Sequence, residues 1–260
     1  MTLSDDDLYR YARQLILNGM TETHQRRLLD AHILLVGAGG LGAPALLYMA
    51  AAGIGHITVM DGDVVDATNL NRQICFTADD IGKPKASTAA EAARKCNPAL
   101  TITAIDEWLD HAAADQIITK DMIVADATDQ AATRVLINQA CHDHGAVMVF
   151  AGASRFEGQI ASFRSGLNAD MPCFSCLFPD ISGTSQIPRC SEVGILGPVT
   201  GMIGSLMAME VMRQCLWPDQ VFGRNLSGQL MLYDGLDHHM QTITVNKRPD
   251  CPVCSSGTTH

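Results

Sequence analysis

Several features that mark whole classes of protein are missing from this sequence. Its 260 residues include 18 Lys or Arg against 28 Asp or Glu, so the positive excess typical of nucleic-acid binders is absent. Low-complexity tracts and internal repeats are also absent, and 47% of the residues are hydrophobic, which excludes a disordered chain. We therefore expect a globular protein with no nucleic-acid partner.

Leader and membrane signals are missing as well. The opening segment, MTLSDDDLYRYARQ, is acidic and polar where a secretory leader would be basic and then apolar. The most apolar stretch, residues 193–212, contains four glycines, a proline and Glu210, so we expect a buried helix there and no membrane span. A cytoplasmic, reducing location follows, where the nine cysteines serve metals or chemistry.

A glycine-rich loop joins a strand pattern to a helix pattern in HILLVGAGGLG, residues 32–42. Gly37, Gly39 and Gly42 match G-x-G-x-x-G, which brings the backbone and a helix N-terminus close to a phosphate. A second strand pattern, HITVMD, ends at Asp61, where a carboxylate can bind ribose hydroxyls. The unit predicts nucleotide binding without naming the nucleotide, and glycines that serve only packing are the alternative.

Strand and helix patterns continue to alternate after this unit, and the second half of the chain changes to hairpin patterns. This order predicts an α/β, Rossmann-like fold: a mostly parallel sheet with helices on both faces and a C-terminal β-rich extension. We expect one domain over residues 1–260, with an N-terminal helical arm (1–30), a nucleotide-binding core (31–153) and a β-rich part (154–260).

Charged residues near the glycine loop indicate phosphate chemistry. Arg72, Lys83 and Lys85 supply cations within a short span, although isolated surface cations would look the same. Asp129 follows a predicted strand, at the sheet edge where ligands bind in such folds. It is a candidate ligand for Mg²⁺, and a helix-capping role is the alternative.

Two C-x-x-C pairs, Cys173 with Cys176 and Cys251 with Cys254, supply the four thiolates of a structural zinc site. The zinc would attach the C-terminal tail to a loop in mid-chain, and a redox pair is the alternative. Cys190 lies beside a cation in a loop-like segment and is a candidate reactive thiol. The remaining cysteines are expected to pack as small hydrophobes; they are Cys75, Cys96, Cys141 and Cys215.

Taken together, several segments resemble the activating enzymes of ubiquitin-like sulfur carriers. They are RYARQ, GAGGLG, DGDVVDATNLNRQ, GKPK, ATDQ, the two C-x-x-C pairs and PRCSEVGILGPVTGMIGSLMAMEVM. This family includes the molybdopterin-synthase adenylyltransferases (MoeB type) and the thiazole-pathway sulfur-carrier adenylyltransferases (ThiF type). The resemblance covers nearly the whole chain and is nearer to the molybdopterin type.

The resemblance implies that the C-terminal carboxylate of a small carrier ending in Gly-Gly attacks the α-phosphate of Mg·ATP. The products are an acyl-adenylate and pyrophosphate, for molybdenum cofactor biosynthesis or, as the alternative, for thiazole biosynthesis. The carrier is expected to bind residues 154–260. The nucleophile is already an anion, so the site needs positioning and charge neutralisation rather than a base.

The resemblance also assigns residue roles. Asp129 is implied to hold Mg²⁺, Arg13 to act across a homodimer interface, and Cys190 to link covalently to the carrier in the thiazole type. The implied nucleotide and phosphate contacts are Gly40, Asp61, Asp63, Asn69, Arg72, Gln73 and Lys85. Asn71 and Gln130 depart from the family pattern, each with an amide of different reach. No sulfurtransferase-like segment follows, so sulfur is expected from elsewhere.

Two other functions fit parts of the sequence. An NAD-dependent oxidoreductase would use the same glycine loop and would not depend on Arg72 or Lys85. A zinc-stabilised scaffold without catalysis would show no turnover of ATP with any partner.

Overall fold

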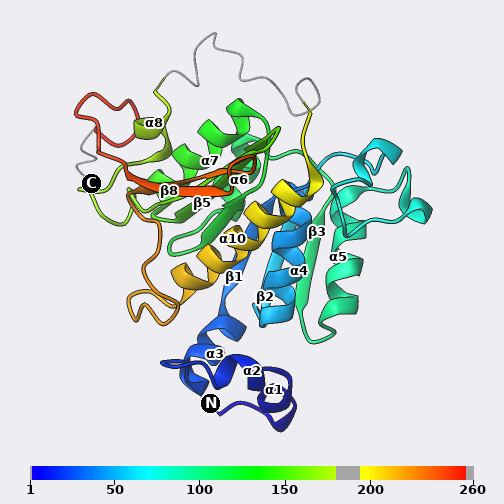
Figure 1. Ribbon diagram of the computed structural model, residues 1–260. Coiled ribbons are helices and arrows are strands. Elements are labelled where there is room, and N and C mark those ends of the chain that lie inside the picture. Colours follow the sequence, from blue (N-terminus) through cyan, green and yellow to red (C-terminus); the bar gives the residue numbers. More distant parts are fainter. Residues whose placement is uncertain (1, 180–193, 256–260) are drawn as a thin grey trace.

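The computed structural model describes residues 2–179 and 194–255 (Figure 1). The strands are β1 (His32–Val36), β2 (His56–Met60), β3 (Thr101–Ile105), β4 (Ile123–Asp126), β5 (Val147–Ser154), β6 (Glu157–Phe163), β7 (Gln229–Asp234) and β8 (His239–Thr244). The helices are α1 (Asp5–Arg10), α2 (Ala12–Leu15), α3 (Glu22–Asp30), α4 (Gly42–Ala52), α5 (Lys85–Cys96), α6 (His111–Ile117), α7 (Ala131–His144), α8 (Phe174–Leu177) and α10 (Gly197–Cys215), with 3₁₀ turns η1 (Ala67–Asn69) and η2 (Ala78–Asp80).

All eight strands form one sheet in the order β3-β2-β1-β4-β5-β6-β7-β8. The first five in this order run parallel, and β6, β7 and β8 are antiparallel additions. The predicted Rossmann-like fold is confirmed. The β-rich extension is a continuation of the same sheet, because β6 turns back along β5 with Ser154 opposite Glu157.

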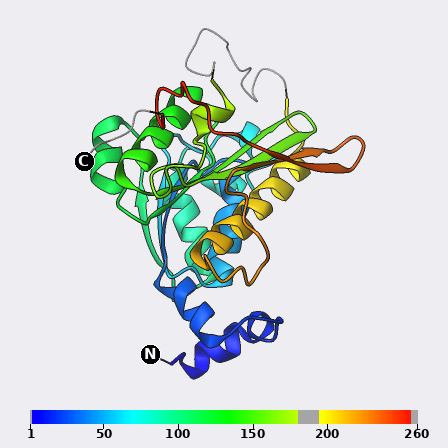
Figure 2. The same ribbon diagram turned by 90° about the vertical axis from the view of Figure 1, so that its left-hand side faces the viewer.

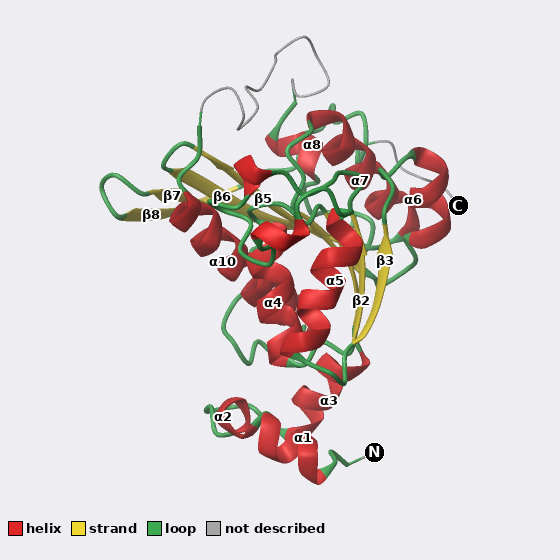
Figure 3. Ribbon diagram, turned by 90° about the vertical axis from the view of Figure 1, so that its right-hand side faces the viewer, coloured by secondary structure: helices red, strands yellow, loops and turns green. Residues whose placement is uncertain are grey.

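Both faces of the sheet are covered by helices, which explains the apolar run of β1 after His32. Alternate side chains point to opposite faces, so Ile33 and Leu35 join one core cluster while Leu34 and Val36 join the other. The first cluster lies under α4, α5 and α10, and the second under α6 and α7. Figures 2 and 3 show these two helical layers from either side of the molecule.

The apolar helix α10 packs against α4 and the sheet. The backbones approach closely at Gly204, where an added Cβ would lie 2.5 Å from the Leu41 carbonyl oxygen. Glu210 is fully buried on this helix and accepts hydrogen bonds from Ser162 Oγ and the Leu226 amide. Among the described residues, none of the helices has the length and apolarity to cross a membrane.

The N-terminal arm, α1 to α3, attaches at the end of the molecule opposite the first turn of α4 (Figure 1). Ser4 caps α1 in a capping box with Asp7, as its spacing suggests. Tyr11 is buried against Gly53, and its hydroxyl accepts a hydrogen bond from Asn97 Nδ2. The arm is therefore tied to the far end of α4.

The prediction for the isolated cysteines is right for Cys141 and wrong for Cys96. Cys141 is buried, whereas Cys96 is exposed, and Cys75 and Cys215 are intermediate. Cys96 is the last residue of α5, where the helix end meets solvent, and the helical pattern alone does not reveal this.

Candidate active site

The glycine loop makes a turn that only glycine permits. Gly37 has φ of +93°, and a Cβ there would lie 2.9 Å from the Ala127 carbonyl oxygen. A Cβ on Gly42 would lie 1.9 Å from the Gly37 carbonyl oxygen. The loop therefore closes on itself and presents the first turn of α4 at the carboxyl edge of the sheet.

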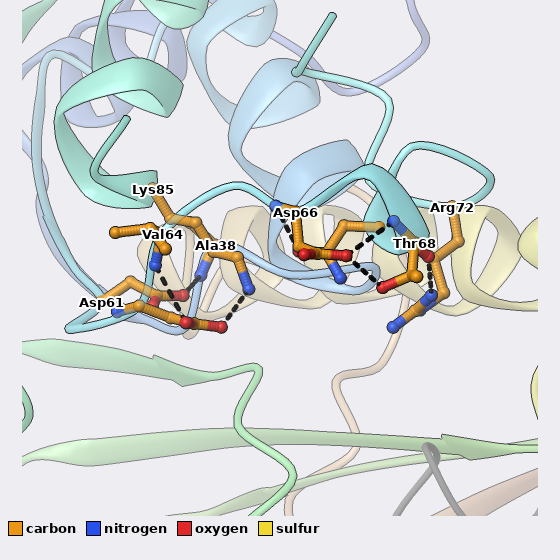
Figure 4. A network of polar contacts seen from close by, with 9 residues as sticks. Ala38, Asp61, Val64, Asp66, Thr68, Arg72 and Lys85 are labelled. Carbon is orange, nitrogen blue, oxygen red and sulfur yellow. Dashed lines mark hydrogen bonds and ion pairs between the residues drawn. The ribbon is translucent and has the colours of Figure 1, made fainter. Parts of the chain in front are cut away.

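Asp61, directly after β2, is connected to the glycine loop. Its Oδ2 accepts a hydrogen bond from the Ala38 amide at 2.8 Å, and its Oδ1 accepts one from the Asp63 amide at 2.9 Å. Burial raises the pKa of Asp61, and these two hydrogen bonds partly offset the rise. Figure 4 shows Asp61 lying beside Ala38 and Lys85.

The predicted cations separate into two groups. Lys85 is only 5% exposed and donates to Asp63 Oδ2, which excludes a solvated surface role. The Arg72 guanidinium donates to the Thr68 carbonyl oxygen at 3.0 Å (Figure 4). It also donates to Asn71 Oδ1 at 3.0 Å. Lys83 is exposed and pairs with Asp80. Arg72 and Lys85 face one cavity, and Lys83 does not.

This cavity has a volume of about 880 Å³ and lies at the carboxyl edge of the parallel strands. It gathers most of the residues predicted for nucleotide binding. They are Gly37, Gly39, Gly40, Asp61, Asp63, Asn69, Arg72, Gln73, Lys85 and Asp129. Gly42 lies behind the wall, Arg13 is exposed on α2 outside it, and Cys190 is outside the described residues.

Four helices begin at the cavity. Leu41, Lys85, Gln130 and Thr200 lie in or directly before the first turns of α4, α5, α7 and α10, and all four line it. Helix N-termini carry unpaired N–H groups and a partial positive charge. The backbone therefore adds to the attraction that Arg72 and Lys85 exert on an anion.

Asp129 stands on the short loop between β4 and α7, exposed and facing the cavity. The residue at the N-cap position of α7 is Gln130, with no side-chain cap, so the capping alternative for Asp129 is wrong. Behind this loop, burial raises the pKa of Asp126, and the nearby Arg134 charge offsets part of the rise.

Other cavity residues were not predicted from the sequence. Trp108 covers Gly62 at the rim, and Arg134, Arg155 and Thr200 line the wall. Arg155 has φ of +52° at the turn between β5 and β6, an uncommon conformation for arginine. Of these residues, only Arg134 could have been found from the sequence, because it lies in the first turn of the helix that follows Asp129.

Unpaired polar atoms in the wall fit a polar ligand such as a nucleotide. Gln73 Oε1 and Arg134 Nε are buried and have no hydrogen-bond partner within the described part of the chain. Buried polar groups in proteins are almost always paired. A ligand rich in donors and acceptors matches this wall better than an apolar one.

A second candidate site is the buried cysteine cluster, where Cys173, Cys176, Cys251 and Cys254 place their sulfurs within 4.8 Å of one another. Cys173 Sγ lies 3.5 Å from Cys251 Sγ, and Cys176 Sγ lies 3.4 Å from Cys254 Sγ. Sulfurs around a tetrahedral zinc ion are separated by roughly 3.8 Å, given Zn–S bonds of about 2.3 Å. The four thiols therefore form a cluster that could hold a metal ion.

The chain is similar to known proteins over nearly its whole length. The sequence profile of the ThiF family matches residues 11–253. A SAMP-activating enzyme E1 from Haloferax volcanii is 39% identical over 259 residues, which cover 99% of this chain and 93% of the relative. A sulfur carrier protein adenylyltransferase from Thermus thermophilus is 38% identical over 256 residues, with coverage of 98% and 93%.

A solved structure shares the fold. The crystal structure of Escherichia coli MccB with ATP superposes with a TM-score of 0.79 at 20% identity, over 94% of this chain and 74% of that one. Together with the two relatives and the matched profile, this agrees with the resemblance in the sequence motifs. The chain belongs to the ThiF family.

Proposed function

We propose that this ThiF-family adenylyltransferase joins AMP to the C-terminal glycine of a small ubiquitin-like sulfur-carrier protein. The observation that carries the proposal is the cavity, where the glycine loop, Arg72, Lys85 and Asp129 converge from separate parts of the chain. Curated relatives named for carrier activation support the partner class, since each covers nearly the whole chain.

The proposed reaction balances without a general base. A carboxylate oxygen of the carrier's last glycine forms a bond to the α-phosphorus of ATP, and the bond from that phosphorus to the bridging oxygen breaks. Pyrophosphate leaves with the electron pair. Because negative charge accumulates on the phosphates, Arg72, Lys85 and the helix N-termini stabilise the transition state by neutralisation.

The wall residues divide the nucleotide between them in this proposal. Gly40 and the glycine loop lie along the nucleotide, Asp61 accepts hydrogen bonds from the ribose, and Asp63, Asn69 and Gln73 border the phosphates. Asp129, exposed and free of a capping bond, would hold Mg²⁺, which neutralises phosphate charge when bound. The tail of the carrier would enter along the β6 to β8 side, where Gln159 and Gln241 line the cavity.

Molybdenum cofactor biosynthesis, with a MoaD-like carrier, is the pathway we propose on the sequence resemblance. Thiazole biosynthesis is the alternative and would require Cys190 to link covalently to its carrier. A third relative, the Arabidopsis thaliana adenylyltransferase and sulfurtransferase MOCS3, is 38% identical, and the match spans 53% of its length. Membership in the ThiF family disfavours the oxidoreductase alternative.

The quaternary and metal assignments are part of the same proposal. A homodimer would bring Arg13 of one subunit to the cavity of the other, which accounts for an exposed arginine on an arm far from its own site. A structural zinc ion would join the four cysteines and fasten the end of the chain to α8. The proposal also includes a cytoplasmic location and the division of the chain into an arm (1–30), a nucleotide-binding core (31–153) and a carrier-binding part (154–260).

The proposal predicts that Arg72→Ala and Asp129→Ala abolish carrier-dependent exchange of pyrophosphate into ATP. Each substitution removes a charge that faces the phosphates and leaves the core untouched. The matched control is Lys83→Ala, which removes an exposed cation outside the cavity and should leave the exchange rate unchanged. Normal exchange in both cavity variants would refute the mechanism.

A further inference from the structure

The loop that carries Asp129 is held from behind rather than by Asp129 itself. Its central residue, Thr128, has three polar groups: an amide, a carbonyl and a hydroxyl. All three are engaged by two buried side chains, Asp126 and Arg134, which belong to different elements. Asp129 is the next residue along the chain.

Asp126 holds Thr128 from the side of the sheet. It is the last residue of β4 and is fully buried. Its Oδ1 accepts a hydrogen bond from the Thr128 amide at 3.0 Å and another from the Thr128 hydroxyl at 2.7 Å. Burying a carboxylate is costly, so an apolar residue at this position would make the fold more stable. The carboxylate therefore indicates that the two hydrogen bonds to Thr128 serve a purpose other than stability.

Arg134 holds Thr128 from the side of the helix. It is 7% exposed, and its Nη2 donates to the Thr128 carbonyl oxygen. The guanidinium lies 4.8 Å from the ring centroid of Phe150 on β5, which fixes its plane. Phe150 in turn packs at 5.1 Å from Phe174 of α8, so the arginine rests on a rigid aromatic surface.

A role in stability alone does not explain this pair. Asp126 Oδ2 and Arg134 Nε are both buried and lack hydrogen-bond partners among residues 2–179 and 194–255. Buried charged side chains that serve stability alone have their remaining polar atoms satisfied. Arg134 also lines the cavity, while Asp126 lies behind it.

We infer that Asp126 and Arg134 are positioning residues that fix Thr128 and thereby aim the Asp129 carboxylate at the phosphate end of the cavity. The inference deepens the proposed function and rests on it for the identity of the ligand. Displacement of a reacting group by about 1 Å can cost about a hundredfold in rate, so a fixed loop has a large kinetic effect.

The test compares Arg134→Met with Arg164→Met. Arg164 is the control: it is partly buried and, like Arg134, stacks on a ring, that of Trp217, but it lies outside the nucleotide cavity. Mg·ATP affinity is measured by calorimetry without any carrier, and amide hydrogen exchange is followed over residues 127–130. Arg134→Met should weaken Mg·ATP binding roughly tenfold and accelerate exchange in that segment, and it should reduce kcat/KM for pyrophosphate exchange roughly 10- to 100-fold. Arg164→Met should change none of these.

Two milder variants keep the inference testable if Arg134→Met does not fold. Thr128→Val removes only the hydroxyl and should weaken Mg·ATP binding severalfold, whereas Thr128→Ser retains every polar group and should restore the wild-type value. Wild-type affinity and amide protection in Arg134→Met or Thr128→Val would overturn the inference. A failure of the proposed function gives a different result: the wild-type protein would bind Mg·ATP but would adenylate no carrier protein.

Discussion

At the scale of single residues, the cavity is organised before any ligand binds. Lys85 is buried with its charge balanced by Asp63, whose own side chain remains half exposed. An incoming phosphate can compete with Asp63 for the ammonium group without the lysine having to leave solvent. The desolvation of the cation is thus already complete in the folded chain, as preorganised electrostatic sites require.

Gly42 offers a residue-scale prediction. Gly42→Ala should lower the free energy of unfolding by about 3 kcal/mol, because its Cβ would meet the Gly37 carbonyl oxygen and open the loop. Gly201→Ala in α10 is the control: its Cβ has open space, so helix propensity should raise stability by up to about 1 kcal/mol. Denaturant unfolding measures both. An unchanged midpoint for Gly42→Ala would contradict the tight loop.

Residues near recognisable motifs could be predicted from the sequence, and residues from distant segments could not. The glycine loop, Asp61 and Asp129 each follow a strand, so their meeting at one sheet edge follows from the fold. Thr200 and Arg155 reach the same cavity only because α10 and the β5–β6 turn fold back over it. No local pattern encodes that contact.

At the scale of elements, α7 connects the two candidate sites. Its first turn carries Arg134, and Asn138, one turn later, contacts the segment that holds the first cysteine pair. Asn138 Oδ1 accepts a hydrogen bond from the Phe174 amide at 2.9 Å, and its Nδ2 donates to Ser175 Oγ at 3.1 Å. The cysteine cluster therefore supports the same helix that borders the nucleotide cavity.

Cys173→Ser tests the metal at this scale. It should eliminate bound zinc and lower the melting temperature by on the order of 10 °C, because metal binding contributes directly to folding free energy. Cys96→Ser is the control, since that thiol is exposed and outside the cluster. Elemental analysis and calorimetry give the readouts. Equal zinc content and melting in both variants would rule out the zinc site.

The hairpin patterns of the second half were predicted as strands, but their place in the sheet was not. Partner choice depends on long-range pairing, such as Ile160 opposite Met231, which sequence periodicity does not specify. The paired cysteines, by contrast, were predicted to meet across most of the second half, because thiolate geometry imposes the contact whatever the intervening chain.

At the scale of the whole molecule, the arm and the cavity lie at opposite ends of the chain's fold. α2, which carries Arg13, is near the amino ends of the strands, and the cavity is at their carboxyl ends (Figure 1). Arg13 therefore cannot serve its own site without large movement of the arm, which Tyr11 anchors. The role proposed for Arg13 therefore requires a second copy of the chain.

Mixed dimers test this arrangement. Arg13→Ala and Asp129→Ala subunits should each be inactive alone, and mixing them in equal amounts should restore about a quarter of the wild-type exchange rate. Random pairing of equal amounts makes half of the dimers hybrids. Each hybrid has one intact site of its two, which gives a quarter of the sites in all. Analytical sedimentation measures the molecular mass and so establishes whether the protein is a dimer. Absence of recovery in confirmed hybrids would show that Arg13 does not act across the interface.

The convergence of four helix beginnings on the cavity has a consequence for its response to acidity. Peptide dipoles have no ionisable proton, and arginine keeps its charge throughout the physiological range. The part of the cavity's positive potential that comes from the helix ends and from Arg72 is thus nearly constant over the range in which histidine titrates. The attraction that the helix ends and Arg72 exert on a phosphate should therefore change little with acidity near neutrality.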